Sequence, residues 1–599
     1  MIGEDVGGVA SRGDRWILFG LLALVVLASS LTPIRNYDYW WHLKTGDLIL
    51  SRHEVPRADP YSFTAAGTPW VDHEWLCQVI LYAGHTLLGP AGLVALKTAL
   101  VLGLCLLMAA HAGREGHGPG GGAVLAAAAL VGSSFRLDVR PELATIILVP
   151  LVIHLVLRAR DTGGAIPLVL VPLLVAVGSN LHAGAVLAPA LLLPGAVLTW
   201  IDGRRPLFLG AAGARGALDR SFAPRLLLAA LAAALAACAN PYGYRIYAVP
   251  FEVRHLLASL PSPNLEWARP DLSAFPLFWL ATAAAVAVVV IAPRRIDPIA
   301  TPALLLGAIL AAAHLRNIGL FFVLLPYGLA RPARAVALAC ARLWARHESP
   351  RPWGVRPGFV IAAVALFCAV PLLALLPPSI TWGLGVAPGN EPRAAVDFVE
   401  SEGIGKRLYN DVRFGGYLIW RRFPRARVFI DGRNEIYPGL LREVFVSLND
   451  SRAWQAFLAT LDIDAAFLRY APALERVVRP GPDGRPGGMV ERAFSVNHFP
   501  KDAWALVYWD DDAMIVVRRS QENAAVIARH EYRAIQPEDW RYLYAGVVTG
   551  HEALGPILGE LRRKLSEDPG CARARSLLAT FGRLAQGLNT PPDRAPAGG

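Results

Sequence analysis

A stretch rich in acids and histidines, residues 36–74, follows directly on the first long apolar run of the chain, residues 16–34. Asp38 and His42 stand four residues apart and would share one face of a helix that begins near position 37. A carboxylate at a membrane surface can act as a base or bind a divalent metal. Asp38 is therefore a candidate catalytic residue and metal ligand, with His42 a candidate substrate-binding residue. The alternative is that Asp38 only caps the helix.

The same stretch ends in Asp72, His73 and Glu74, directly ahead of another apolar segment. Glu74 is a second candidate catalytic residue, and His73 is a candidate substrate-binding residue. Acids at this place could equally be helix N-terminal charges that the helix dipole favours. Both interpretations stay open at this point.

Further acids lie between later apolar runs. Asp138 and Glu142 flank Arg140 in the sequence RLDVRPE, and they could present two carboxylates to the metal that Asp38 binds. An alternative is a loop in which the arginine neutralises the acids. Glu266 lies late in a long loop and is a candidate catalytic acid on a mobile lid, or else a surface acid.

Three other polar residues are candidate substrate-binding groups. Arg316 opens an apolar run, and a guanidinium there suits phosphate recognition, although it could also be a snorkelling end residue. Tyr242 is part of a turn signal, Asn-Pro-Tyr-Gly at 240–243, and Arg245 follows it; both could line a groove. His182, between two apolar runs, is interpreted as a structural histidine.

Composition sets the class of protein that carries these residues. Of 599 residues, 54% are hydrophobic and 18% are charged, and the mean hydropathy is +0.40, which is typical of a polytopic membrane protein. The net charge of +11 lies largely in arginines between apolar runs, so it indicates membrane topology and not a nucleic-acid partner. The six cysteines form no CxxC and no disulfide framework.

The apolar runs predict about eleven membrane spans. They are 16–34, 91–111, 122–135, 142–158, 165–178, 183–200, 224–239, 275–292, 298–313, 316–330 and 357–377, with 76–89 interpreted as interfacial. With the N-terminus in the cytoplasm, the arginine-rich loops fall inside, as the positive-inside rule requires. The candidate residues above then fall outside together.

The distribution of apolar and polar residues along the chain predicts three regions. Residues 1–380 form the transmembrane domain with its large first outer loop at 35–75, and residues 390–520 alternate short strands with helices, as in an extracytoplasmic α/β domain. The runs YLIW (417–420) and ARVFID (426–431) are two of the expected strands. Residues 521–599 form a helical tail with one tetratricopeptide-like helix pair and a disordered end. The expected location is the inner (cytoplasmic) membrane. There is no Walker loop, GxSxG or HExxH motif.

Five motifs together resemble a known family. They are DYWWHLKTGDLIL after the first span, DVRPE with Asp138 and Glu142, SPNLEWARP with Glu266, and, in the soluble half, NDVRFGGYLIW and RVFIDGRNE. This arrangement resembles the GT-C membrane glycosyltransferases, and among them the oligosaccharyltransferase catalytic subunit. Residues 413–417 lack the Trp-Trp-Asp of that subunit's WWDYG motif, so an acceptor other than a glycosylation sequon is expected. The motif pattern is also similar to one in uncharacterised bacterial membrane proteins.

The resemblance implies an inverting, metal-assisted transfer of sugar from a polyprenyl-(pyro)phosphate donor in the membrane to an extracytoplasmic acceptor. Mg²⁺ or Mn²⁺ would be held by Asp38, Asp138 and Glu142, Arg316 or Arg245 would hold the phosphate, and Asp38 or Glu74 would orient or deprotonate the acceptor. Two other functions remain: a transporter or flippase for a polyprenyl lipid, and a non-catalytic assembly scaffold. Polar groups gathered at one face, without an internal repeat, favour the enzyme over the transporter.

Overall fold

The chain forms two units in a computed structural model that describes residues 12–205, 207–208, 221–258, 265–345, 361–369, 381–471, 474–480 and 486–589. The first unit comprises Met1–Arg57 and Trp70–Val386, and the second comprises Ala58–Pro69 and Ala387–Gly599. The polar stretch 36–74 is therefore divided: its two ends belong to the helical unit and its middle belongs to the second unit.

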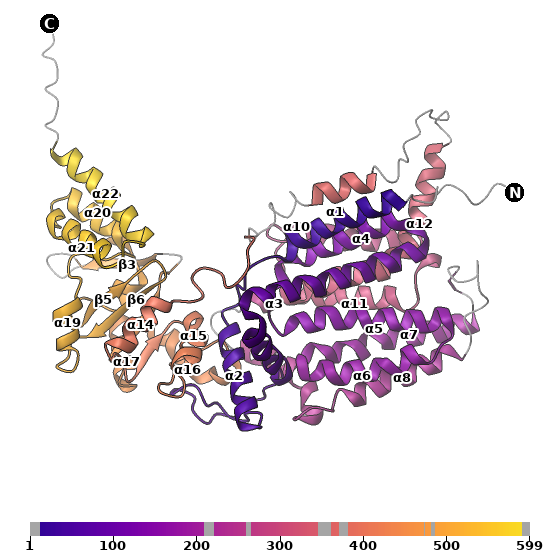
Figure 1. Cartoon of the computed structure of the whole chain (residues 1–599), viewed down its shortest axis with the longest axis horizontal. Coiled ribbons are helices and arrows are strands. Elements are labelled where there is room, and N and C mark those ends of the chain that lie inside the picture. The colour runs from indigo at the N-terminus through magenta and orange to yellow at the C-terminus, as the bar shows by residue number, and fades with distance from the viewer. Residues whose placement is uncertain are drawn as a thin grey trace, which may run out of the picture. The chain divides into compact units, whose positions relative to one another are not determined.

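The first unit is helical. Its helices are α1 (Arg12–Ser30), α2 (Tyr39–Arg52), α3 (Trp75–Ala112), α4 (Gly118–Ser133), α5 (Glu142–Thr162), α6 (Ile166–Leu181), α7 (Leu187–Arg204), α8 (Phe222–Ala236), α9 (Val249–Ala258), α10 (Pro276–Ile291), α11 (Ala300–Ala313) and α12 (Ile318–Ala345). The helices α3, α4 and α5 run side by side (Figure 1). Val101, Val149 and Phe321, from three different helices, are fully buried in the apolar core.

Five segments in the described part of the chain are long and apolar enough to cross a membrane. They are Arg12–Ser30, Trp75–Arg136, Glu142–Thr162, Ala183–Arg204 and Leu315–Cys340, and four shorter apolar helices, α6, α8, α10 and α11, accompany them. These helices fit a multi-pass membrane protein. The count of eleven spans stays a prediction, and most of the expected span 357–377 lies outside the described residues.

The segment 76–89 is the first part of α3, and Gly89, with a φ of 66°, separates it by a kink from the rest of that helix. The helix α2 packs against this first part. A Cβ at Gly46 would lie 2.2 Å from the carbonyl oxygen of Gln78, so the glycine of the Thr-Gly pair permits the close approach. The packing fixes the start of α2 beside the start of α3, where the candidate residues lie.

The second unit contains a four-stranded sheet in the order β1-β2-β6-β5. Its strands are β1 (Leu408–Asn410), β2 (Ala465–Arg469), β5 (Trp504–Trp509) and β6 (Ala513–Arg518). Strands β1 and β2 are parallel and the other pairs are antiparallel, so the sheet is partly parallel, as predicted. The strands β3 (Glu475–Pro480) and β4 (Pro486–Arg492) form a separate two-stranded antiparallel sheet.

Helices accompany and follow this sheet. Those among the strands are α14 (Arg393–Ser401), α15 (Val412–Arg422), α16 (Pro438–Ser447), α17 (Ser451–Thr460) and α18 (Phe494–His498). The tail contains α19 (Ala524–His530), α20 (Trp540–Val548), α21 (Leu554–Glu567) and α22 (Ala572–Asn589), of which the last two pack together. Its likeness to a tetratricopeptide pair stays a prediction, and the expected disordered end, from residue 590, lies outside the described residues.

A buried ion network connects the segment Ala58–Pro69 to the rest of the second unit. Arg433 donates to Asp59 at 2.8 Å and to Asp431 at 2.6 Å, and all three side chains are fully buried. The carboxylate of Asp59 also accepts the backbone N–H groups of Tyr61 and Ser62. The Asp-Gly-Arg motif is therefore part of the core of this unit.

Candidate active site

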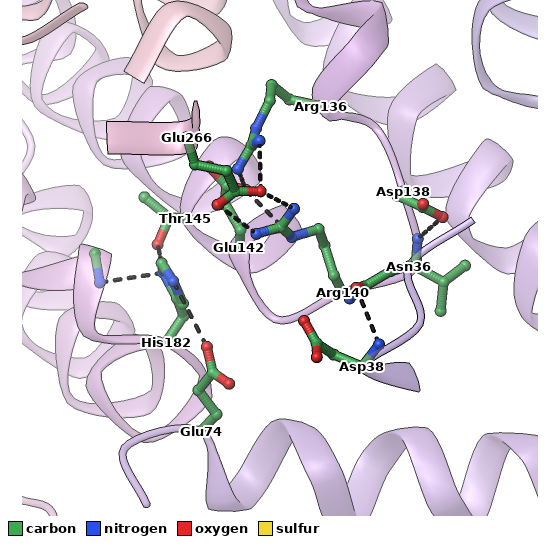
Figure 2. A network of polar contacts seen from close by, with 12 residues as sticks. Asn36, Asp38, Glu74, Arg136, Asp138, Arg140, Glu142, Thr145, His182 and Glu266 are labelled. Carbon is green, nitrogen blue, oxygen red and sulfur yellow. Dashed lines mark hydrogen bonds and ion pairs between the residues drawn. The ribbon is translucent and has the colours of Figure 1, made fainter. Parts of the chain in front are cut away.

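The polar candidates of the first unit gather where successive helices meet. They come from the starts of α2, α3 and α5, from η2 (Ser134–Arg136), from the turn between α6 and η3 (Ala183–Val186), and from η5 (Leu265–Trp267) and η7 (Leu315–Asn317). Figure 2 shows Glu74 and His182 on one side of this cluster and a set of arginines and glutamates on the other. Loops distant in sequence thus form one polar centre.

Glu74 lies among three imidazoles. Its carboxylate oxygens are 3.8 Å from Nε2 of His42, 3.6 Å from Nε2 of His73 and 3.7 Å from Nε2 of His182. Burial raises the pKa of Glu74 to about 7, against the opposing charges of Arg140 and Arg316. Such a carboxyl group can gain and release a proton near neutral pH, which a general base requires.

The orientation of the His182 ring is fixed from the side opposite Glu74. Its Nδ1 accepts the N–H of Gly184 at 3.1 Å and lies 2.8 Å from the hydroxyl of Thr145. Burial keeps the pKa of His182 well below its usual value, so the ring is neutral and its single proton is on Nε2, which faces Glu74. A Cβ at Gly184 would lie 2.6 Å from the Thr145 hydroxyl, which explains the glycine after the histidine.

Two arginines and two glutamates form an ion-pair cluster beside Glu74 (Figure 2). Arg136 donates to Glu142 and, at 3.0 Å, to Glu266. Arg140 donates to both oxygens of Glu266, at 3.0 and 3.3 Å, and its Nε lies 3.3 Å from Glu142. Burial opposes ionisation of Glu266, but the two guanidiniums outweigh it and hold the pKa of this carboxyl well below its usual range. Glu266 is therefore an ionised partner of the arginines, which does not suit a general acid.

Arg316 lies near this cluster without joining its ion pairs. Its guanidinium stacks over the ring of Trp267 at 4.7 Å. The segment that carries it is tied to that of Trp267, because His314 Nδ1 contacts the Trp267 carbonyl at 2.8 Å and the N–H of Leu315 donates to Ala268 at 2.9 Å. Among the described residues, no carboxylate lies within 4 Å of Arg316.

Asp38 and Asp138 point in different directions. Asp38 precedes α2, accepts the indole N–H of Trp41 at 3.0 Å, and its carboxylate faces the centre of the cluster in Figure 2. Asp138 accepts the backbone N–H of Arg35 at 3.1 Å and of Val139 at 2.8 Å. Asp138 thus holds the chain that leads into α2.

The predicted metal set of Asp38, Asp138 and Glu142 requires a correction. Within the ranges that the structure describes, no group of three or more His, Cys, Asp or Glu side chains is placed to hold a metal ion. The physical reason is that backbone amides occupy Asp138 and two guanidiniums occupy Glu142. These residues do not fit Mg²⁺ or Mn²⁺ as predicted, and no step below passes through a metal.

Of the two other candidates, Tyr242 forms hydrogen bonds to the outer loop, and Arg245 forms no described ion pair with the polar cluster. The hydroxyl of Tyr242 accepts the N–H of Asp72 at 2.9 Å and donates to the carbonyl of Pro56 at 3.4 Å, so it joins the two parts of the outer loop that flank residues 58–69. Arg245, in η4 (Gly243–Tyr247), is exposed. In the described structure it forms no ion pair with the cluster.

The fold has solved relatives. The chain is similar to the apo oligosaccharyltransferase of Archaeoglobus fulgidus, with 9% identity, 92% of this chain and 86% of that chain covered, and a TM-score of 0.51. The same enzyme tethered to an acceptor peptide with the NVT sequon matches at 9% identity, 93% and 86% coverage and a TM-score of 0.52. The AglB complex from that organism with an inhibitory peptide and a dolichol-phosphate matches at 10% identity, 97% and 87% coverage and a TM-score of 0.51. The fold is GT-C-like. No protein-family model and no curated protein sequence matches the chain.

Three residues of the cluster are not among the candidate site residues predicted from the sequence. They are Arg136, Arg140, which the sequence suggests only as a neutraliser of neighbouring acids, and His182, which it suggests as a structural histidine. The signal that was available is the placement of all three in loops on one side of the predicted topology. Their partners are far away in sequence, since Glu266 is 130 positions from Arg136.

Proposed function

We propose that this protein is a membrane glycosyltransferase that transfers a sugar from a polyprenyl-phosphate-linked donor to an acceptor outside the cytoplasm, with inversion at the sugar carbon. The observation that carries the proposal is Glu74, a carboxyl group with a pKa near 7 amid three imidazoles and beside arginines. The GT-C-like fold supports it, because the structural relatives include an enzyme bound to an acceptor peptide and a complex with dolichol-phosphate.

The reaction is a single displacement. The acceptor oxygen or nitrogen attacks the anomeric carbon, and Glu74 takes the proton that the acceptor loses. The bond between the anomeric carbon and the phosphate oxygen breaks, and its electron pair leaves on the phosphate. Attack from the face opposite the phosphate inverts the configuration. Positive charge at the leaving group stabilises the transition state, and Arg316 can supply that charge.

The neighbouring side chains have supporting roles. His182 and His73 orient the Glu74 carboxylate, and His42 closes the third side of it. Asp38 faces the same centre and orients the acceptor. Tyr242 positions the loop that carries Asp72 and, two residues later, Glu74.

The acceptor differs from that of the peptide-modifying relatives. The segment with the sequence Arg-Phe-Gly-Gly-Tyr, residues 413–417, takes the place of the Trp-Trp-Asp sequence. A Cβ at Gly415 would lie 2.1 Å from the carbonyl oxygen of Ile430, so this glycine serves packing inside the second unit. We therefore propose an extracytoplasmic acceptor other than a glycosylation sequon, and a location in the cytoplasmic membrane with the second unit outside.

The test uses the full chain reconstituted in lipid vesicles with polyprenyl-linked sugars. Transfer is followed as release of polyprenyl phosphate and as sugar attached to a panel of glycan, lipid and peptide acceptors. The wild type should release polyprenyl phosphate in an acceptor-dependent manner, with inverted configuration in the product. Glu74→Gln should not, whereas Glu54→Gln, at an exposed acid of the same outer stretch, should behave as the wild type. Equal release by wild type and Glu74→Gln would contradict the proposal.

A further inference from the structure

Resting on the proposed function, we propose that Arg316, Arg136 and Arg140 form the donor-phosphate site and that this arginine centre binds one phosphate without a divalent cation. The sequence predicts a metal-assisted site, whereas in the structure the acids of this centre are paired with arginines.

The acids that could ligate a cation here already have cationic partners. Glu266 is contacted by three guanidinium nitrogens at 3.0–3.3 Å, and Glu142 is contacted by both Arg136 and Arg140. A divalent cation at either carboxylate would lie against these guanidiniums and would have to displace them. The side chains of Arg136 and Glu142 are each only 7% exposed, so water screens this repulsion weakly.

Of the three arginines in the described part of this cluster, Arg316 is the one without a carboxylate partner. It is held over the Trp267 ring, and no described carboxylate lies within ion-pair distance of it. Its planar guanidinium can donate two parallel hydrogen bonds to one phosphate, which lysine cannot reproduce. The ring contact and the backbone bonds between residues 314–315 and 267–268 orient this side chain before the donor arrives.

The balance of charges indicates one phosphate. Two carboxylates pair with Arg136 and Arg140, so one positive charge, that of Arg316, is not matched by a direct partner. A polyprenyl phosphosugar carries one negative charge on its phosphodiester, whereas a diphosphate donor carries two. Asp38 acts on Arg140, and ionised Glu74 acts on Arg140 and Arg316, at longer range, and both acids add further negative charge that disfavours a diphosphate. The centre therefore matches a single phosphodiester better than a diphosphate.

Two measurements on the full chain in nanodiscs test this site: phosphate binding with EDTA present, and sugar transfer either in EDTA or in added Mg²⁺. The probes are polyprenyl monophosphate and polyprenyl diphosphate, measured by competition against a fluorescent polyprenyl phosphate. The wild type should prefer the monophosphate by about tenfold or more, and its transfer rate should be the same in EDTA and in added Mg²⁺. Arg316→Gln should weaken monophosphate binding about 10- to 100-fold, and Arg316→Lys should recover part of this loss. Arg254→Gln, at an exposed arginine of α9, is the matched control and should change neither the monophosphate binding nor the transfer rate.

The outcomes separate this inference from the proposed function. Sugar transfer that stops in EDTA and returns with Mg²⁺, or that uses only a diphosphate donor, would contradict the metal-free arginine site. The same result would still support the proposed glycosyltransferase activity. Binding of monophosphate that Arg316→Gln leaves unchanged would also contradict the arginine site. Arg316-dependent binding without transfer from any donor would support the site and contradict the glycosyltransferase.

Discussion

Nε2 of His182 lies 3.7 Å from Oε1 of Glu74, and the other ring nitrogen accepts the N–H of Gly184. The backbone therefore fixes which nitrogen holds the proton and directs it to the carboxylate side. Thr145 contacts the same acceptor nitrogen from α5. The short turn after α6 thus places an oriented imidazole beside Glu74.

The rate of sugar transfer should rise with pH through neutrality. Burial raises the pKa of Glu74 to about 7, so below that pH most molecules hold the protonated carboxyl and lack the base. The single-turnover rate should increase about tenfold per pH unit below pH 7 and level off above it. A residual rate in Glu74→Gln should show no such step. A wild-type profile that is flat from pH 5.5 to 8.5 would contradict the role of Glu74 as base.

Substitution Tyr242→Phe should weaken the outer loop and leave the chemistry intact. It removes the hydroxyl that accepts the N–H of Asp72 and donates to Pro56, at a cost of about 1 kcal/mol in the free energy of unfolding. Thermal unfolding in detergent and steady-state kinetics check this. The KM should increase more than the kcat falls, whereas complete loss of activity in a folded variant would place Tyr242 among the reacting groups.

Substitution Gly46→Ala should separate α2 from α3. The added Cβ would meet the Gln78 carbonyl oxygen at 2.2 Å, and relief of this clash should cost roughly 1–3 kcal/mol of stability. Gly103→Ala is the matched control, because the space around that Cβ is open in the described structure. Unfolding temperatures in detergent should fall for the first variant only. Equal values for both would show that the close approach is not required.

Substitution Arg433→Met should destabilise the second unit strongly. It leaves Asp59 and Asp431 buried without their guanidinium, at a cost of about 3–5 kcal/mol. The control is Arg425→Met, since Arg425 is 76% exposed and its pair with Glu400 contributes about 0–1 kcal/mol. Limited proteolysis should cut Arg433→Met faster within residues 58–69. Equal cleavage of the two variants would contradict a structural role of the network.

The sequence predicted the GT-C-like fold, because the five motifs that resemble that family are spread over most of the chain. It did not predict the pairing of Arg136 with Glu266, since a contact between loops 130 residues apart leaves no local pattern. The roles of Asp38, Glu74 and the other candidates stay predictions that only activity can test.

Two runs of the second unit that the sequence predicts as strands are not strands of the sheet in the structure. The run Tyr417 to Trp420 is short and apolar, and its first three residues are buried, which fits a strand or a helix; it lies in α15. Asp411 decides between them, because its side chain caps that helix by accepting the N–H of Arg413 at 2.9 Å. The expected strand 426–431 forms one isolated bridge, from Val428 to Ser62, and no named strand of the described sheet.

The single-turnover rate of sugar transfer by Glu74→Gln tests the central claim most directly. The wild type, Glu74→Gln and Glu54→Gln are compared in vesicles at pH 8 with one polyprenyl-linked donor, after equal folding is checked by thermal unfolding. Loss of the general base should lower the rate about 10²–10⁴-fold in Glu74→Gln, with donor binding retained and with Glu54→Gln at the wild-type rate. A folded Glu74→Gln variant that transfers sugar at the wild-type rate would contradict the account.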